Sequence, residues 1–247
     1  MNRLIAQQKR FSLGRETVKY IAVICMVLDH VAWYFLPFST PTAQVFHFLG
    51  RITAPVMCFF LAQGVRRTRN IRRYLLRMLL FAAAAQLPWW YLHKEQKFSL
   101  NMLFTLFFCL LMLYIDSLDA PLVLRAGGVV LCIAATNYCD WAFFAPLWCL
   151  VFYHLHADRS KETLAFSAVA LCYYAKGVIR RLDANYPLQR ALTGSLFMLG
   201  VFLALPLLRF ADENRRDLRH PAFHKWFFYV FYPAHLGVIA IIKMLAK

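Results

Sequence analysis

Nine apolar stretches, each about 16 to 22 residues long, follow one another along this chain of 247 residues and constrain its fold more than any other feature. An α-helix needs about 20 such residues to cross the hydrocarbon core of a bilayer. The sequence therefore predicts an all-α polytopic membrane protein, a single bundle of about nine transmembrane helices with a range of eight to ten. The predicted spans are 19–37, 44–65, 73–92, 100–115, 121–137, 141–156, 163–179, 189–209 and 225–246.

The composition agrees with a membrane location. Hydrophobic residues make up 61% of the chain and the mean hydropathy is +0.52, whereas a soluble domain is about half apolar. The first stretch is long enough to span a bilayer and no small-residue cleavage pattern ends it, so we interpret it as a span rather than a signal peptide. Residues 1–247 form one predicted domain without long linkers or repeats, and residues 1–18 are a predicted cytoplasmic N-terminal segment.

The formal net charge of +16 comes mainly from basic residues in the short loops between spans. This distribution is typical of cytoplasmic loops and does not indicate a nucleic-acid partner. The loops "VRRTRNIRRYLLR" and "RFADENRRDLRHPAFHK" predict a cytoplasmic N-terminus and an external C-terminus. One basic loop disagrees with this orientation. Either the region that contains this loop is re-entrant, or one weakly apolar span is misassigned. The basic residues of this loop, which would face outward, are Lys176, Arg180, Arg181 and Arg190.

Ionisable residues fall inside several predicted spans, where they are costly and mark functional sites by default. Asp29 and His30 lie about ten residues, or roughly 15 Å, into the first span. Arg51 reaches a similar depth in the second span, where Pro55 would free a backbone carbonyl, and His235 lies midway along the last. These residues can form a shared reaction cavity, or a structural ion pair beside a core histidine. Their similar depth favours a site.

Neighbouring residues on a helix point about 100° apart, so one of Asp29 and His30 can face Arg51 while the other faces the cavity. Weaker polar signals either line a cavity or form interhelical hydrogen bonds, and they are Gln63, Gln86, Asn101 and Thr105. His47 and His93 lie near the outer boundary of the membrane and are expected to be exposed.

Neither the cysteines nor any common catalytic motif points to a second kind of site. The seven cysteines include no CxxC pair, so neither a disulfide framework nor a metal site is predicted. No Walker A, GxSxG, HExxH or GxGxxG motif is present.

A cluster of six arginines without an acidic residue precedes the third predicted span. As a topology signal it needs no further explanation. The same cluster suits a polyphosphate ligand through bidentate contacts, and coenzyme A is such a ligand. Its members are Arg66, Arg67, Arg69, Arg72, Arg73 and Arg77.

Five segments of the sequence together resemble the TraX family, integral membrane proteins named for the acetylase of conjugative pilin. They are "VKYIAVICMVLDHVAWYF", "FLGRITAPVMCFFLAQGVRRTRNIRRYLLRML", "AQLPWW", "LNMLFTLFFCLLM" and "FYVFYPAHLGVIA". The resemblance covers the first 115 residues and the last 25. The motif positions that match are Asp29, His30, Arg51, Pro55, Thr68, Arg69, Asn70, Asn101, Tyr232, Pro233 and His235.

This resemblance implies a bacterial inner-membrane enzyme that acetylates the amino terminus of a protein with acetyl-CoA, without a metal. It also implies a relationship to transmembrane acyltransferases. The resemblance implies that the acceptor is a pilin-like protein, although nothing in the sequence itself identifies a pilin. The alternative is an O-acyltransferase, whose acceptor would be an envelope glycan or a lipid headgroup. Membrane lipids surround the protein. Alternatives of other classes are a proton-coupled transporter, against which the lack of internal repeats counts, and a non-catalytic assembly protein.

The residues permit a mechanism in which His30 is the general base. Asp29 would orient His30, pair with Arg51 or hold an acceptor ammonium. Arg51 or Asn101 would stabilise the oxyanion, and His235 is a second candidate for proton transfer. The predicted acetyl-CoA-binding residues are Arg66, Arg67, Thr68, Arg69, Asn70 and Arg73.

Overall fold

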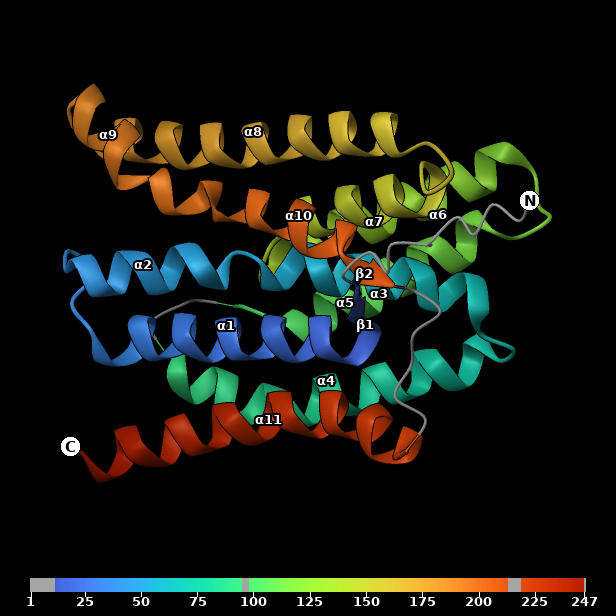
Figure 1. The fold of residues 1–247 in the computed structure, drawn as a ribbon, viewed down its shortest axis with the longest axis horizontal. Coiled ribbons are helices and arrows are strands. Elements are labelled where there is room, and N and C mark those ends of the chain that lie inside the picture. Colours follow the sequence, from blue (N-terminus) through green and yellow to red (C-terminus); the bar gives the residue numbers. More distant parts are fainter. Residues whose placement is uncertain (1–11, 95–97, 213–218, 247) are drawn as a thin grey trace, which may run out of the picture.

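The computed structural model describes residues 12–94, 98–212 and 219–246. Within these ranges the chain is almost entirely helical, and its helices run roughly along the long axis of the molecule (Figure 1). The elements are β1 (Leu13–Gly14), α1 (Arg15–Phe35), α2 (Pro41–Gly50), α3 (Thr53–Arg67), α4 (Ile71–Leu92), α5 (Met102–Asp116), α6 (Leu122–Ala135), η1 (Thr136–Tyr138), α7 (Phe144–His154), α8 (Arg159–Asp183), α9 (Leu188–Gly194), η2 (Leu196–Leu203), α10 (Ala204–Arg209), β2 (Ala211–Asp212) and α11 (Pro221–Leu245).

Each predicted span corresponds to a helix or to a run of consecutive helices, which confirms the all-α polytopic fold. Five segments of the described chain are long and apolar enough to cross a membrane, namely α1, α2 with α3, α4, the run from α9 to α10, and α11. The helices α5, α6 with η1, and α7 are apolar but shorter. Most of the predicted N-terminal segment, residues 1–11, lies outside the described residues.

Two short strands add a small element that the sequence did not predict. β1 and β2 pair in parallel, with Leu13 opposite Ala211 and Gly14 opposite Asp212. This pairing joins the start of α1 to the segment after α10. It therefore ties two distant parts of the chain together at the same end of the bundle.

The second predicted span is broken into α2 and α3 at Arg51 and Ile52. Pro55 has no N–H to donate to the carbonyl of Arg51, so the regular hydrogen-bond ladder cannot continue through this point. The Ile52 N–H instead bonds the Leu49 carbonyl at 3.2 Å, three residues back. The break sets the Arg51 side chain at a junction between helices.

The chain passes back and forth along the bundle, so that α1 begins toward one end of it and α11 finishes at the other (Figure 1). α3, most of whose first half is buried, packs against α1, α5 and α7, while α4 packs against α5 and α11. We call the end at which α1, α4 and α11 begin and α3 ends the basic end. α8 is one continuous helix of 25 residues that starts at the basic end and finishes at the opposite end.

Candidate active site

A cavity of about 640 Å³ lies between α1, α3, α4, α5 and α11. Toward the basic end its lining is rich in positive charge, and Glu16 is the acidic residue among the described lining residues. The basic lining residues are Arg15, Lys19, Arg67, Arg69, Arg77, His224 and Lys225. A negatively charged ligand is therefore attracted to this opening.

The inner part of the cavity is largely apolar. Methionines from four helices line it, and flexible methionine side chains adapt to ligands of irregular shape. They are Met26 of α1, Met57 of α3, Met78 of α4 and Met102 of α5. Thr53 and Tyr232 add hydroxyl groups farthest from the opening, beside Phe231. The cavity thus changes from cationic to apolar along its length.

A histidine pair lies just beyond the inner part of the cavity. The His235 ring is 5.3 Å from the Phe231 ring and 5.3 Å from the Tyr232 ring, measured between centroids, and both of those rings line the cavity. His30 follows Met26 by one helical turn on α1. The rings of His30 and His235 are 4.9 Å apart and nearly parallel.

The hydrogen bonds of this pair define which nitrogen atoms carry protons. His235 Nδ1 lies 3.1 Å from the Phe231 carbonyl, which can only accept, so neutral His235 carries its proton on Nδ1. His235 Nε2 therefore accepts from His30 Nδ1–H at 2.7 Å. The remaining nitrogen, Nε2 of His30, keeps its lone pair and has the properties of a general base.

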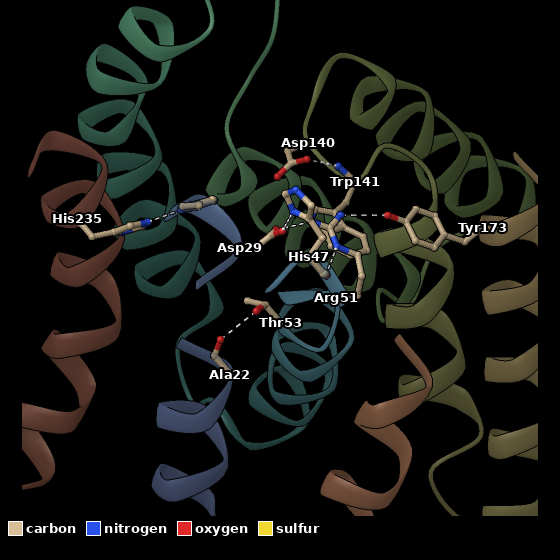
Figure 2. A network of polar contacts seen from close by, with 10 residues as sticks. Ala22, Asp29, His47, Arg51, Thr53, Asp140, Trp141, Tyr173 and His235 are labelled. Atoms are coloured by element: carbon tan, nitrogen blue, oxygen red, sulfur yellow. Dashed lines mark hydrogen bonds and ion pairs between the residues drawn. The ribbon is translucent and has the colours of Figure 1, made fainter. Parts of the chain in front are cut away.

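Asp29 belongs to a separate polar network between α1 and α2 (Figure 2). One carboxylate oxygen accepts from His47 Nδ1 at 2.7 Å and the other pairs with the Arg51 guanidinium. Arg51 also donates to the His47 carbonyl and to the Tyr173 hydroxyl, each at 3.2 Å. Both oxygens of Asp29 are therefore occupied, and this buried ion pair is well supported by hydrogen bonds.

The structure thus separates two residues that are adjacent in sequence. Asp29 points toward α2 (Figure 2). His30 instead contacts His235 of α11. Gly50 allows the close approach of α2, because a Cβ atom there would lie 2.3 Å from the Asp29 Cβ. The Asp29–Arg51 pair lies outside the residues that line the cavity.

The loop between η1 and α7 covers this network. Trp141 adopts a positive φ of 66°, and its ring lies 4.9 Å from Arg51 Cζ and stacks on Tyr173. Burial raises the pKa of the neighbouring Asp140 to about 6, and the positive charge of Arg51 opposes that rise. The network therefore joins α1, α2, α8 and this loop.

Asn101 has a clear local role at the start of α5. Its side-chain oxygen accepts from the Leu103 N–H at 2.9 Å, which caps the helix. Its side-chain amide donates to the Ala82 carbonyl and to Gln86 Oε1, both at 2.8 Å. Asn101 is fully buried, and its hydrogen-bonding groups are engaged with α4 and α5.

The predicted acetyl-CoA-binding residues fall into two groups. Arg67, Thr68 and Arg69 line the cavity. Arg66 donates to the Phe152 carbonyl at 3.0 Å, and Asn70 caps α4 by accepting from the Arg73 N–H at 2.9 Å. These last residues lie at the basic end without lining the cavity.

Sequence reasoning missed several cavity residues at the basic end. They are Arg15, Lys19 and Lys225. Arg77, which belongs to the arginine cluster but was not among the predicted acetyl-CoA-binding residues, also lines the cavity. Arg15 and Lys19 are four residues apart, a spacing that places two side chains on one face of a helix. That spacing was the available signal, but it does not tell which neighbouring helix the face meets.

The expectation that His47 is exposed is wrong, because its side chain is completely buried. It lies four residues before Arg51, so both project from the same side of α2. Trp33, Phe38 and Phe197 surround its ring, and its Nε2 finds no partner among the described residues. His93 is half-buried, and its Nε2 lies 3.3 Å from the Tyr34 hydroxyl.

Comparison with known proteins identifies the family. A family model described as TraX protein matches residues 14–243. The chain belongs to the TraX family. It is also similar to a protein of Dichelobacter nodosus named "Probable fimbrial assembly protein FimC, serogroup H1", with 31% identity over 239 residues that cover 92% of this chain and 94% of the relative. No solved structure matches this TraX family member.

Proposed function

We propose that this TraX family member is a membrane acetyltransferase that moves an acetyl group from cytosolic acetyl-CoA to an acceptor amine. The observation that carries the proposal is the order of groups along one cavity. A cationic opening leads to an apolar interior, which ends one helical turn from a histidine with a free basic nitrogen. Acetyl-CoA has the matching order of phosphates, a long thin arm and a terminal thioester.

The donor would enter from the basic end, which this proposal places on the cytoplasmic side because cytoplasmic loops carry an excess of basic residues. Arg67 and Arg69 would hold its phosphates together with the other basic lining residues, since guanidinium groups bind phosphate in a bidentate manner. Arg66 and Arg73 would add to the positive field from outside the cavity. Asn70 would fix the turn that carries Thr68 and Arg69, because it caps α4.

His30 would act as the general base. Its Nε2 takes a proton from the acceptor amine as the nitrogen attacks the thioester carbon, while His235 accepts the hydrogen bond from Nδ1–H and stabilises the imidazolium. When the carbon–sulfur bond breaks, His30 returns that proton to the thiolate of CoA. The acceptor gains an acetyl group, and free CoA leaves with a thiol.

Asp29 would serve as a positioning residue. With both carboxylate oxygens engaged by His47 and Arg51, it ties α1 to α2 and so fixes the rotation of α1 about its own axis. That rotation directs His30 toward α11. In this proposal Arg51 holds Asp29 and does not contact the substrate.

The acceptor would be the amino terminus of a pilin-like protein inserted in the membrane. The family is named for a pilin acetylase, and the Dichelobacter relative is named as a fimbrial assembly protein. An amine reaching His30 from the opposite end of the bundle would pass between α1, α4 and α11, beside Tyr34 and His93.

Transfer of labelled acetyl from acetyl-CoA to an acceptor peptide by the purified protein tests this function. We expect His30→Ala to lower the transfer rate about 100-fold or more, because positioned general bases contribute that much. Its acetyl-CoA affinity, measured by calorimetry, should remain close to that of the native protein. His156→Ala removes an exposed histidine in the loop before α8 and is the matched control.

The outcomes separate the alternatives. Failure of the native protein to bind acetyl-CoA would favour a transporter or an assembly factor over an enzyme. Binding with full activity in His30→Ala would remove this residue from the base role. Mass spectrometry of proteins and envelope glycans from cells with and without the protein would identify the acceptor, and an acetylated glycan or lipid headgroup would favour O-acyl transfer.

A further inference from the structure

Acyl transfer from a thioester needs a hydrogen-bond donor for the oxygen that becomes negatively charged in the transition state. The three donor nitrogens of Arg51 are engaged by Asp29, His47 and Tyr173. The side-chain amide of Asn101 is engaged by Ala82 and Gln86. Neither residue lines the cavity. The donor must therefore come from another group.

We infer that the hydroxyl group of Tyr232 is this donor, and that it binds the carbonyl oxygen of the acetyl thioester. This inference rests on the proposed function and adds to it the residue that stabilises the oxyanion. Tyr232 lines the inner part of the cavity, is 5% exposed, and lies beside His235, with ring centroids 5.3 Å apart. The oxyanion donor and the histidine pair are thus neighbours on α11.

The hydrogen bond that Tyr232 accepts leaves its own proton available. The Met102 N–H donates to the Tyr232 oxygen at 3.3 Å. Within the described part of the chain, the Tyr232 hydroxyl donates no hydrogen bond. Thr53, the other hydroxyl at this depth of the cavity, donates to the Ala22 carbonyl at 2.9 Å and is therefore occupied (Figure 2).

The start of α5 strengthens this donor. Asn101 accepts from three N–H groups of α5, that of Leu103 through its side chain and those of Phe104 and Thr105 through its carbonyl. The Met102 N–H is left for Tyr232. It sits at the positive end of a helix dipole, and a hydroxyl that accepts a hydrogen bond becomes a better donor, because hydrogen bonds in chains polarise one another.

In the reaction, the acceptor nitrogen bonds to the thioester carbon and the carbonyl π electrons move onto oxygen. Tyr232 donates a hydrogen bond to that oxygen and keeps its proton. The electrons then re-form the carbonyl, the carbon–sulfur bond breaks, and the thiolate takes the proton held on His30. Tyr232 is unchanged at the end, so atoms and charges balance without another reactant.

Infrared difference spectroscopy of acetyl-CoA labelled with ¹³C at the carbonyl tests the contact directly. We expect the carbonyl stretch to shift to lower frequency when the donor binds the native protein, because a hydrogen bond weakens the C=O bond. In Tyr232→Phe the stretch should return toward the frequency of a carbonyl in an apolar site. A purely structural tyrosine would leave the shift unchanged, which would overturn the inference.

Kinetics provide the second readout. Tyr232→Phe should lower kcat about 100-fold or more, the usual effect of deleting an oxyanion donor, while the Kd for acetyl-CoA stays within about threefold because a transition-state interaction is lost. The matched control is Tyr174→Phe. It removes a hydroxyl on α8 that bonds the Leu192 carbonyl at 3.2 Å, away from the cavity, and should leave kcat unchanged.

The results distinguish this inference from the proposed function. If the native protein transfers acetyl and Tyr232→Phe does so at the same rate, the inference is wrong and the function stands. If the native protein does not bind acetyl-CoA, both fail. A variant that keeps its acetyl-CoA affinity and melting temperature but loses both kcat and the infrared shift supports the assignment of Tyr232.

Discussion

Asp29 and His30 are neighbours in sequence, but their side chains contact different helices. Successive residues on a helix differ in direction by about 100°, so a fixed rotation of α1 directs Asp29 to α2 and His30 to α11. The acidic residue is engaged by His47 and Arg51, and the imidazole keeps a free nitrogen. In the proposed function, a pair of ionisable residues that is costly within a membrane span thus supplies one positioning group and one basic group.

Gly50 is the position at which this arrangement is most sensitive to a single methyl group. In Gly50→Ala the new Cβ would lie 2.3 Å from the Asp29 Cβ, so α1 and α2 must separate. We expect a lower melting temperature in detergent and a large loss of acetyl transfer, since breaking a buried ion pair costs about 3 to 5 kcal/mol.

Gly237→Ala on α11 is the matched control for that substitution. No atom of another helix lies within 4 Å of a Cβ placed there, so its melting temperature should be unchanged or slightly higher. If both alanine variants melt at the temperature of the native protein, the close approach at Gly50 does not hold Asp29 in place.

Helix starts position the inner part of the cavity. α5 begins at Met102 because Asn101 caps it, and α3 begins after the break that Pro55 imposes. These two starts place Met102 and Thr53 in the lining of the cavity, where the Met102 N–H contacts the Tyr232 hydroxyl of α11. The polar groups of the cavity therefore depend on where helices begin as well as on which residues they contain.

Asn101→Ala should destabilise the protein more than Asn70→Ala does. Both substitutions remove a helix cap, which costs about 1 kcal/mol. Asn101 is also buried, and its replacement removes the hydrogen bonds of its side-chain amide to the Ala82 carbonyl and to Gln86 Oε1, at a further cost of about 1 to 3 kcal/mol. Thermal unfolding in one detergent measures the difference, and equal shifts would show that these two bonds contribute nothing.

The molecule has two unlike ends. The basic end holds the opening of the cavity, and the opposite end holds the end of α11 and the basic turns that finish α8 (Figure 1). The chain enters at the basic end and finishes at the other, as the predicted odd number of spans requires. α8 is one continuous helix, and the basic residues of its last turn, Arg180 and Arg181, lie at the end of the bundle opposite the basic end.

Reporter fusions test the orientation proposed for these ends. A cytoplasmic basic end requires that green fluorescent protein fused after Lys247 stays dark and that alkaline phosphatase fused there is active. Fusions after Asp119, in the loop between α5 and α6 at the basic end, should give the reverse pattern. Fluorescence from the C-terminal fusion would place the cavity opening outside the cell.

The sequence by itself determined the helical membrane fold, the approximate spans and the presence of ionisable residues at mid-depth. These three features follow from the hydropathy and charge of residues that are consecutive in the sequence. It also resembled the TraX family, and the family match over residues 14–243 confirms that resemblance.

Only the tertiary structure decided which residues meet. His30 contacts His235, which is 205 positions away, and Arg51 contacts Tyr173, which is 122 positions away. Such contacts depend on the rotation of each helix and on which helices are neighbours, and both are set by packing between distant segments. For that reason His47 was expected at the surface, and Tyr232 was only one residue of a motif until its position beside the cavity and Met102 was known.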